Sequence, residues 1–78
     1  MDHKDVWDAI EHFAKSHEMS CSKLARVSGL DPTTFNRSKR IDKFGKPRWP
    51  STHSIAKILI ATKEPLDGFI KYLQNKDL

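Results

Sequence analysis

The chain has 78 residues, with 37% hydrophobic and 31% charged side chains, so it has room for one domain around a single core. Its longest apolar run, residues 58–61, is too short to cross a bilayer, and its N-terminus lacks an apolar secretory segment, which predicts a soluble cytoplasmic protein without a membrane partner. One cysteine excludes an internal disulfide framework, and the net charge of +4 points to a polyanionic partner.

The first helix is predicted over about residues 3–16. Asp2 can cap its N-terminus, because a short acidic side chain accepts hydrogen bonds from the first free backbone N–H groups. Apolar residues follow at helical spacing: Val6, Ile10, Phe13 and Ala14. This face of the helix is therefore expected to enter the core.

The second helix is predicted over about residues 20–28. Ser20 can cap it, while Met19 and Leu24 stand where a hydrophobic staple requires apolar side chains. Gly29 ends it, since glycine adopts without steric cost the left-handed conformation that is common at helix C-termini.

A third, short helix is predicted over about residues 31–40, because Asp31 can cap it and Pro32 suits the first helical position. On this helix Phe35 would face inward. The opposite side would carry polar and cationic groups: Thr33, Asn36, Arg37 and Arg40. The helix belongs to the most basic third of the chain, residues 23–48, in which eight basic residues stand against two acidic ones.

The next segment, residues 41–50, is predicted to be a loop because it holds a glycine and two prolines. Its two large aromatic residues, Phe44 and Trp49, are expected to pin the loop to the core, since a chain this small needs its large apolar groups for packing. The alternative for Trp49 is stacking on a base or a ribose, as aromatic residues amid positive charge do in single-strand binders.

Ser51 can cap a fourth helix, and Pro65 can open a fifth. Apolar residues keep helical spacing in both: Ile55, Ile58 and Leu59, then Leu66, Phe69, Ile70 and Leu73. The stripe on the fifth helix suits either the core or a dimer surface. Since no segment shows the alternation typical of a strand, the sequence predicts an all-α fold of five short helices.

The second and third helices would be joined by a turn of about three residues, which is the spacing of a helix-turn-helix unit. Ala25 is small where the two helices would cross, and Gly29 allows the sharp reversal of the chain. In such a unit the second helix lies in the major groove of DNA and presents side chains to the bases. This interpretation requires residues 31–40 to be helical, with Phe35 turned inward and Arg37 outward.

The runs SKLARVSGLDPTTFNRSKR and GKPRWPSTHSIAKIL resemble the N-terminal DNA-binding domain of phage-repressor-like (lambda-repressor-like) helix-turn-helix regulators. More narrowly, the chain is similar to bacterial members in which this domain precedes a LexA-like peptidase domain. The resemblance covers about residues 6–73 and implies a five-helix lambda-repressor-like bundle. It also implies that residues 1–78 form one domain, the N-terminal part of a longer, nucleoid-associated repressor whose homodimer forms mainly through a C-terminal domain.

By resemblance, four positions on the third helix would read bases: Thr33, Thr34, Asn36 and Arg37. The N-terminus of the second helix would meet phosphate through three residues: Ser20, Ser22 and Lys23. The remaining basic side chains are expected to attract phosphate without regard to sequence: Lys39, Arg40, Lys43, Lys46 and Arg48. The expected function is therefore sequence-specific binding of double-stranded operator DNA by a transcriptional repressor.

No enzyme activity and no cofactor are predicted, because the chain has no paired carboxylates, no nucleophile-and-base pattern and too few glycines for a nucleotide-binding loop. A metal site at His12, His17 and Cys21 is not expected, since a helix break after His17 separates their faces; Cys21 is expected to be a packed thiol. Two other functions stay open. One is an RNA or single-stranded nucleic-acid binder that uses the basic loop, and the other is a protein-interaction module whose basic surface meets an acidic partner.

Overall fold

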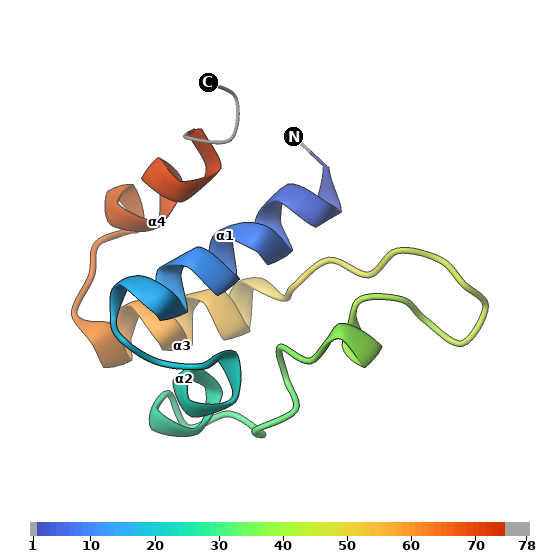
Figure 1. Ribbon diagram of the computed structural model, residues 1–78, viewed down its shortest axis with the longest axis horizontal. Helices are drawn as coiled ribbons and strands as arrows, with labels where there is room; N and C mark the ends of the chain where they lie inside the picture. The colour runs from blue at the N-terminus through green and yellow to red at the C-terminus, as the bar shows by residue number, and fades with distance from the viewer. Residues whose placement is uncertain (1, 75–78) are drawn as a thin grey trace.

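The computed structural model of the chain, described here for residues 2–74, is built from four α-helices (Figure 1). In chain order they are α1 (His3–Ser16), α2 (Cys21–Val27), α3 (Thr52–Thr62) and α4 (Leu66–Gln74). One short 3-10 helix, η1 (Arg37–Lys39), lies in the long connection between α2 and α3. Over residues 2–74 the fold is all-α, as predicted, but it has four α-helices instead of five.

The helix starts follow the capping residues of the sequence. Asp2 and Asp5 form a reciprocal capping box at α1, with N–H to carboxylate distances of 3.0 and 3.1 Å. Each predicted N-cap side chain accepts a backbone hydrogen bond: Asp2, Ser20 and Ser51. α2 ends before Gly29, which has a left-handed φ of +76° as its predicted role requires.

The core forms where α1 meets the other helices. α1 packs against α4 on one side and against α2 on the other, and α2 in turn contacts α3 (Figure 1). The Phe13 ring is fully buried and lies edge-on to the rings of Phe69 and Tyr72, at centroid distances of 5.8 and 6.0 Å. Each apolar side chain of this size that leaves water contributes about 1.5–3 kcal/mol, so α1 is the central stabilising element.

The helix predicted over residues 31–40 is not formed. Hydrogen bonds between residues three apart close a turn there instead, from the Thr34 N–H to the Asp31 carbonyl and from the Asn36 N–H to the Thr33 carbonyl. Asn36 is then extended, with ψ of 151°, before η1 begins at Arg37. The helical prediction is therefore wrong for this stretch, and the second helix of a helix-turn-helix unit is missing from the free chain.

Two physical reasons account for this difference. The Asp31 carboxylate accepts the Thr33 N–H at 2.8 Å and the Thr33 hydroxyl at 2.6 Å, so it closes a local turn that competes with the helix. A stretch this short is not stable as a helix without a buried apolar face, and Phe35, 1% exposed, is its only buried side chain. Tertiary contacts at both ends of the stretch therefore decide its conformation.

The expectation that Phe44 and Trp49 pin the loop to the core is also wrong, since Phe44 is 77% exposed and Trp49 57% exposed. Residues 41–48, called the arm below, leave the bundle as a projecting loop, coloured green-yellow in Figure 1. An isolated antiparallel bridge between Ile41 and Pro47 closes it. Within the arm, the N–H groups of Phe44 and Lys46 donate to the Asp42 carboxylate, so the loop keeps its shape without a contact between the Phe44 ring and the core.

Candidate nucleic-acid interface

Lys23 and Arg26 are exposed on α2, and the other exposed cations of the chain's basic third lie along one continuous excursion, residues 33–48, which leaves the bundle after α2 and returns to it before α3 (Figure 1). This excursion is called the basic segment below. Five cationic side chains on it are exposed: Arg37, Lys39, Lys43, Lys46 and Arg48. Of the predicted base-reading residues, Thr33 and Asn36 are exposed as well, while Thr34 is half-buried. The inner side of the segment is held by the buried ring of Phe35.

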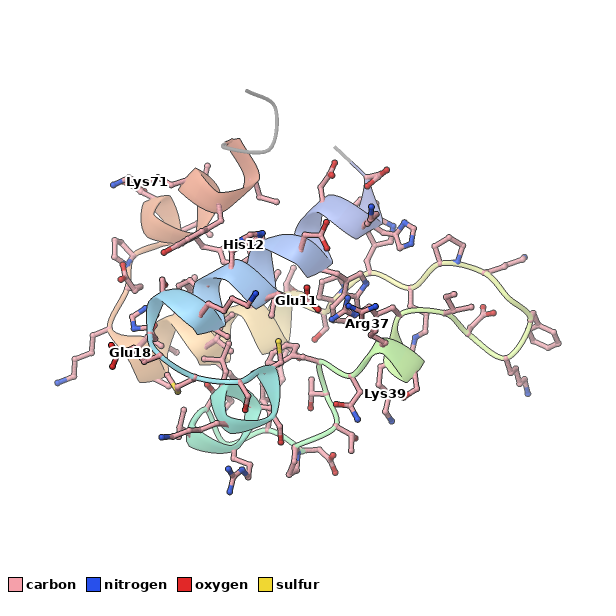
Figure 2. All side chains as sticks on the ribbon, viewed as in Figure 1. Glu11, His12, Glu18, Arg37, Lys39 and Lys71 are labelled. Carbon is pink, nitrogen blue, oxygen red and sulfur yellow. The ribbon has the colours of Figure 1, made fainter. Side chains whose placement is uncertain are left out.

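Two shallow hollows beside η1 divide the predicted base-reading residues between two faces, and a third, of about 660 Å³, is lined by residues of η1 and the arm and by none of the base-reading residues. The larger of the first two, of about 340 Å³, has a polar and aromatic lining that includes Thr33, Thr34, Lys39, Arg48 and Trp49. The smaller, of about 280 Å³, is lined in part by Glu11, Ser20, Cys21 and Arg37. Figure 2 shows Arg37 and Lys39 pointing away from η1 in different directions, with Glu11 on the side of Arg37.

The structure therefore brings the predicted residues into two new groups. Thr33 and Thr34 join Lys39, which was assigned to phosphate, whereas Arg37 joins Ser20 at the start of α2. Asn36 lines neither hollow. Thr33 and Arg37 would share a face in a helix; the extended conformation at Asn36, between them, accompanies their separation.

Arg40 has a structural position that differs from that of the other cations. Its guanidinium donates to Glu11 Oε1 at 2.9 Å and to the Phe35 carbonyl at 3.2 Å. It also lies 5.1 Å from the ring centre of Trp7, within the range of a cation–π contact. Only 16% of the Arg40 side chain is exposed, so this cation holds the basic segment to α1 instead of facing solvent.

A second attachment lies at the other end of the arm. The indole N–H of Trp7, a residue 4% exposed, donates to the Arg48 carbonyl at 2.8 Å. Beyond it the Trp49 ring meets His3 edge-on, at a centroid distance of 6.3 Å. Trp7 therefore contacts both ends of the arm, because it accepts the Arg40 guanidinium over its ring and donates to Arg48 from its nitrogen.

Negative charge limits the cationic character of the hollow lined by Thr33 and Lys39. Asp31 lines it, and the pKa of this carboxyl is lowered, first by the hydrogen bond from the Thr33 hydroxyl and then by that from the Thr33 N–H. Asp31 is therefore ionised at neutral pH beside Lys39 and Arg48. On the arm, three exposed cations stand against one acidic residue: Lys43, Lys46 and Arg48 against Asp42.

The N-terminus of α2 has three exposed residues that were predicted to meet phosphate: Ser20, Ser22 and Lys23. The Ser20 hydroxyl oxygen accepts the Lys23 N–H at 3.1 Å as the helix cap. Cys21 is half-buried, and burial, followed by the nearby Glu11 charge, raises the pKa of its thiol. The thiol is thus protonated at neutral pH, which fits a packing role and not a nucleophile.

Over residues 2–74, no group of three or more histidine, cysteine, aspartate or glutamate side chains could hold a metal ion. In the same range no helix is long and apolar enough to cross a membrane.

Sequence reasoning missed the exposed ring of Phe44 and the role of Trp7. A signal for the first was present, since Asp42 followed by Gly45 is a turn pattern that can close a narrow hairpin. No local signal could reveal the second, because Trp7 and Arg48 are 41 residues apart.

No known protein family matches the sequence, and no curated protein or solved structure is significantly similar to the chain. The resemblance to phage-repressor-like regulators therefore stays a prediction from the sequence runs quoted above. The fold defines the chain only as an all-α domain, over residues 2–74, that carries a basic and largely non-helical excursion.

Proposed function

We propose that the chain is a sequence-specific double-stranded DNA-binding domain of a transcriptional repressor, in which residues 31–40 enter the major groove. The proposal rests on how the basic segment is attached to the bundle and which of its side chains face solvent. Phe35 is buried on its inner side, while its cations and the polar residues Thr33 and Asn36 are exposed on the outer side. A surface of this composition suits a partner with regularly spaced phosphates and hydrogen-bonding bases.

Residues 31–40 must change conformation on DNA before their side chains can contact the bases. The proposal is that residues 31–40 become one helix in the complex and complete a helix-turn-helix unit with α2. The turn at Gly29 and the buried Phe35 support it. The turn at Thr33 and Thr34 and the turn of η1 are separated by the extended Asn36, so rotation of ψ at this residue toward helical values would join them.

The helical form would return Thr33 and Arg37 to one face, where both could meet base edges. Its formation has a cost, because Arg40 must give up or rearrange its bonds to Glu11 and to the Phe35 carbonyl. Binding energy from the phosphates would offset this cost, as in other segments that become ordered on their partner. Arg37 is the leading base contact, since arginine can bind the two acceptors of guanine together, for about 1–3 kcal/mol of discrimination.

The test begins with duplexes selected from a random library by the wild-type chain. Arg37→Ala is expected to reduce the ratio between selected and scrambled duplex affinities, whereas Lys46→Ala weakens both to the same extent. Far-ultraviolet circular dichroism should show a gain of helix when the selected duplex is added. Equal losses on both duplexes for Arg37→Ala, together with no gain of helix, would remove residues 31–40 from the base-reading role.

A second function is favoured by the exposed aromatic rings. Phe44 and Trp49 stand in solvent among Lys43, Lys46 and Arg48, a composition typical of single-stranded DNA or RNA binders. In that case single strands should quench tryptophan fluorescence more than duplexes do. Because Trp7 is buried, the quenching should come from Trp49 and disappear in Trp49→Phe.

A further inference from the structure

The tip of the arm presents one aromatic ring to solvent. Phe44 is 77% exposed, more than any other large apolar side chain of the described residues. The arm projects away from the bundle, on the side opposite the connection between α3 and α4 (Figure 1). This ring therefore lies far from the core that a phenylalanine usually joins.

Local hydrogen bonds fix the loop that carries the ring. The Asp42 carboxylate accepts the N–H groups of both Phe44 and Lys46, at 2.8 and 2.9 Å. The Asp42 N–H donates to the Lys46 carbonyl at 2.8 Å, and Gly45 takes a left-handed φ of +80° that the tight return of the chain requires. The exposure of Phe44 is thus built into the geometry of the arm.

The base of the arm is equally defined. The Arg48 N–H donates to the Arg40 carbonyl at 2.8 Å, and the Arg48 carbonyl accepts the Trp7 indole N–H at 2.8 Å, so these attachments do not depend on the Arg40 side chain. The arm is therefore a preformed projection, and little conformational freedom would be lost when it enters a partner.

The charges around Phe44 indicate the chemistry of that partner. Lys43 Nζ lies 5.2 Å from the ring centre, and Lys46 and Arg48 are exposed on the same arm. The acidic residue of the arm, Asp42, is half-buried and uses a carboxylate oxygen in two backbone hydrogen bonds. An exposed aromatic ring with cations around it is complementary to stacked bases flanked by phosphates.

We propose that the arm is a minor-groove contact, in which Phe44 enters between two base pairs while Lys43, Lys46 and Arg48 bind the phosphates beside it. This inference rests on the proposed binding of double-stranded DNA and adds a second groove to it. Proteins that bend DNA through the minor groove insert apolar side chains of this kind as wedges. The preferred sites would contain A·T pairs and flexible pyrimidine–purine steps.

The experiment uses two synthetic duplex polymers, alternating poly(dI–dC) and poly(dG–dC). Their major-groove edges are alike, but guanine adds an amino group in the minor groove that inosine lacks. Wild-type chain is expected to bind poly(dI–dC) about tenfold more tightly, and Phe44→Ala should lose most of this preference. Ile60→Ala is the matched control, because Ile60 is 75% exposed in the last turn of α3, and α3 ends on the side opposite the arm (Figure 1); it should behave as wild type.

The possible outcomes distinguish a failure of the minor-groove inference from a failure of the proposed function. If wild type binds both polymers equally and Phe44→Ala changes neither affinity, the minor-groove inference is overturned while duplex binding stands. If Phe44→Ala weakens binding only to single-stranded poly(dT), the ring contacts unpaired bases and the inference is likewise overturned. If wild type binds no duplex at all, both proposals fail. Circular dichroism of Phe44→Ala checks that this exposed substitution leaves the fold intact.

Discussion

The stretches 31–40 and 51–62 begin with similar signals but fold differently. Each starts with a capping residue, Asp31 or Ser51, and both side chains accept backbone N–H groups as caps do. The second stretch continues as α3, whose Ile58 is buried and whose Ile55 and Leu59 pack against the core. The first buries only Phe35 and remains a turn. A cap therefore locates a helix start, whereas a buried apolar stripe decides whether the helix exists.

Removal of the Phe35 ring is expected to have the largest effect on stability, and it tests whether this ring holds residues 31–40 in place. Phe35→Ala is expected to lower the free energy of unfolding by about 3–5 kcal/mol, because the ring is 1% exposed and a cavity would replace it. Urea unfolding followed by circular dichroism measures the change. Phe44→Ala is the matched control and should lie within about 0.5 kcal/mol of wild type. A loss below about 1 kcal/mol for Phe35→Ala would mean that the basic segment is not held by this ring.

An intermediate effect is expected at the base of the arm. Trp7→Phe keeps most of the buried apolar surface but removes the N–H donated to the Arg48 carbonyl, so stability should fall by about 1–2 kcal/mol. Hydrogen exchange measured by NMR should become faster at the Arg48 amide than at amides in the middle of α1. Unchanged exchange at Arg48 would show that the indole contact does not fix the arm.

The smallest effect concerns the turn that replaces the predicted helix. The pKa of Asp31 is below its ordinary value because the ionised carboxyl accepts the Thr33 hydroxyl and N–H. The turn therefore gains stability above the ordinary pKa, and this gain is lost as the pH falls through the lowered one. Thr33→Val should raise the pKa of Asp31 toward its ordinary value in an NMR titration. An unchanged pKa would contradict the observed turn.

The sequence predicted the parts of the fold that depend on local pattern. The capping residues, the helical spacing of apolar side chains and the glycine after α2 located the four α-helices correctly, and the burial of Phe35 followed from the same periodicity. What it missed depends on contacts between distant residues. Arg40 was assigned to phosphate, yet the structure pairs it with Glu11, 29 residues away, and no local pattern reveals such a pair.

The candidate site was predicted in composition but not in arrangement. The exposed cations lie where the charge distribution placed them, along residues 37–48. The grouping of Thr33 with Lys39, and of Arg37 with Ser20, depends on the backbone at Asn36, which helical periodicity does not describe. The exposed Phe44 follows from the Asp42 turn, a competing local structure that outweighed the tendency of large rings to enter the core.

The double attachment of the arm to α1 has a consequence for proteolysis. Trypsin cleaves after lysine and arginine except before proline, so the exposed Lys43 is a cleavage site between the two attached residues, Arg40 and Arg48, whereas Lys46 precedes Pro47. A single cut at the tip would break the peptide chain without separating the fragments, because each new end stays in contact with the same tryptophan. The nicked protein should elute from a sizing column as one species and divide into two bands only after denaturation.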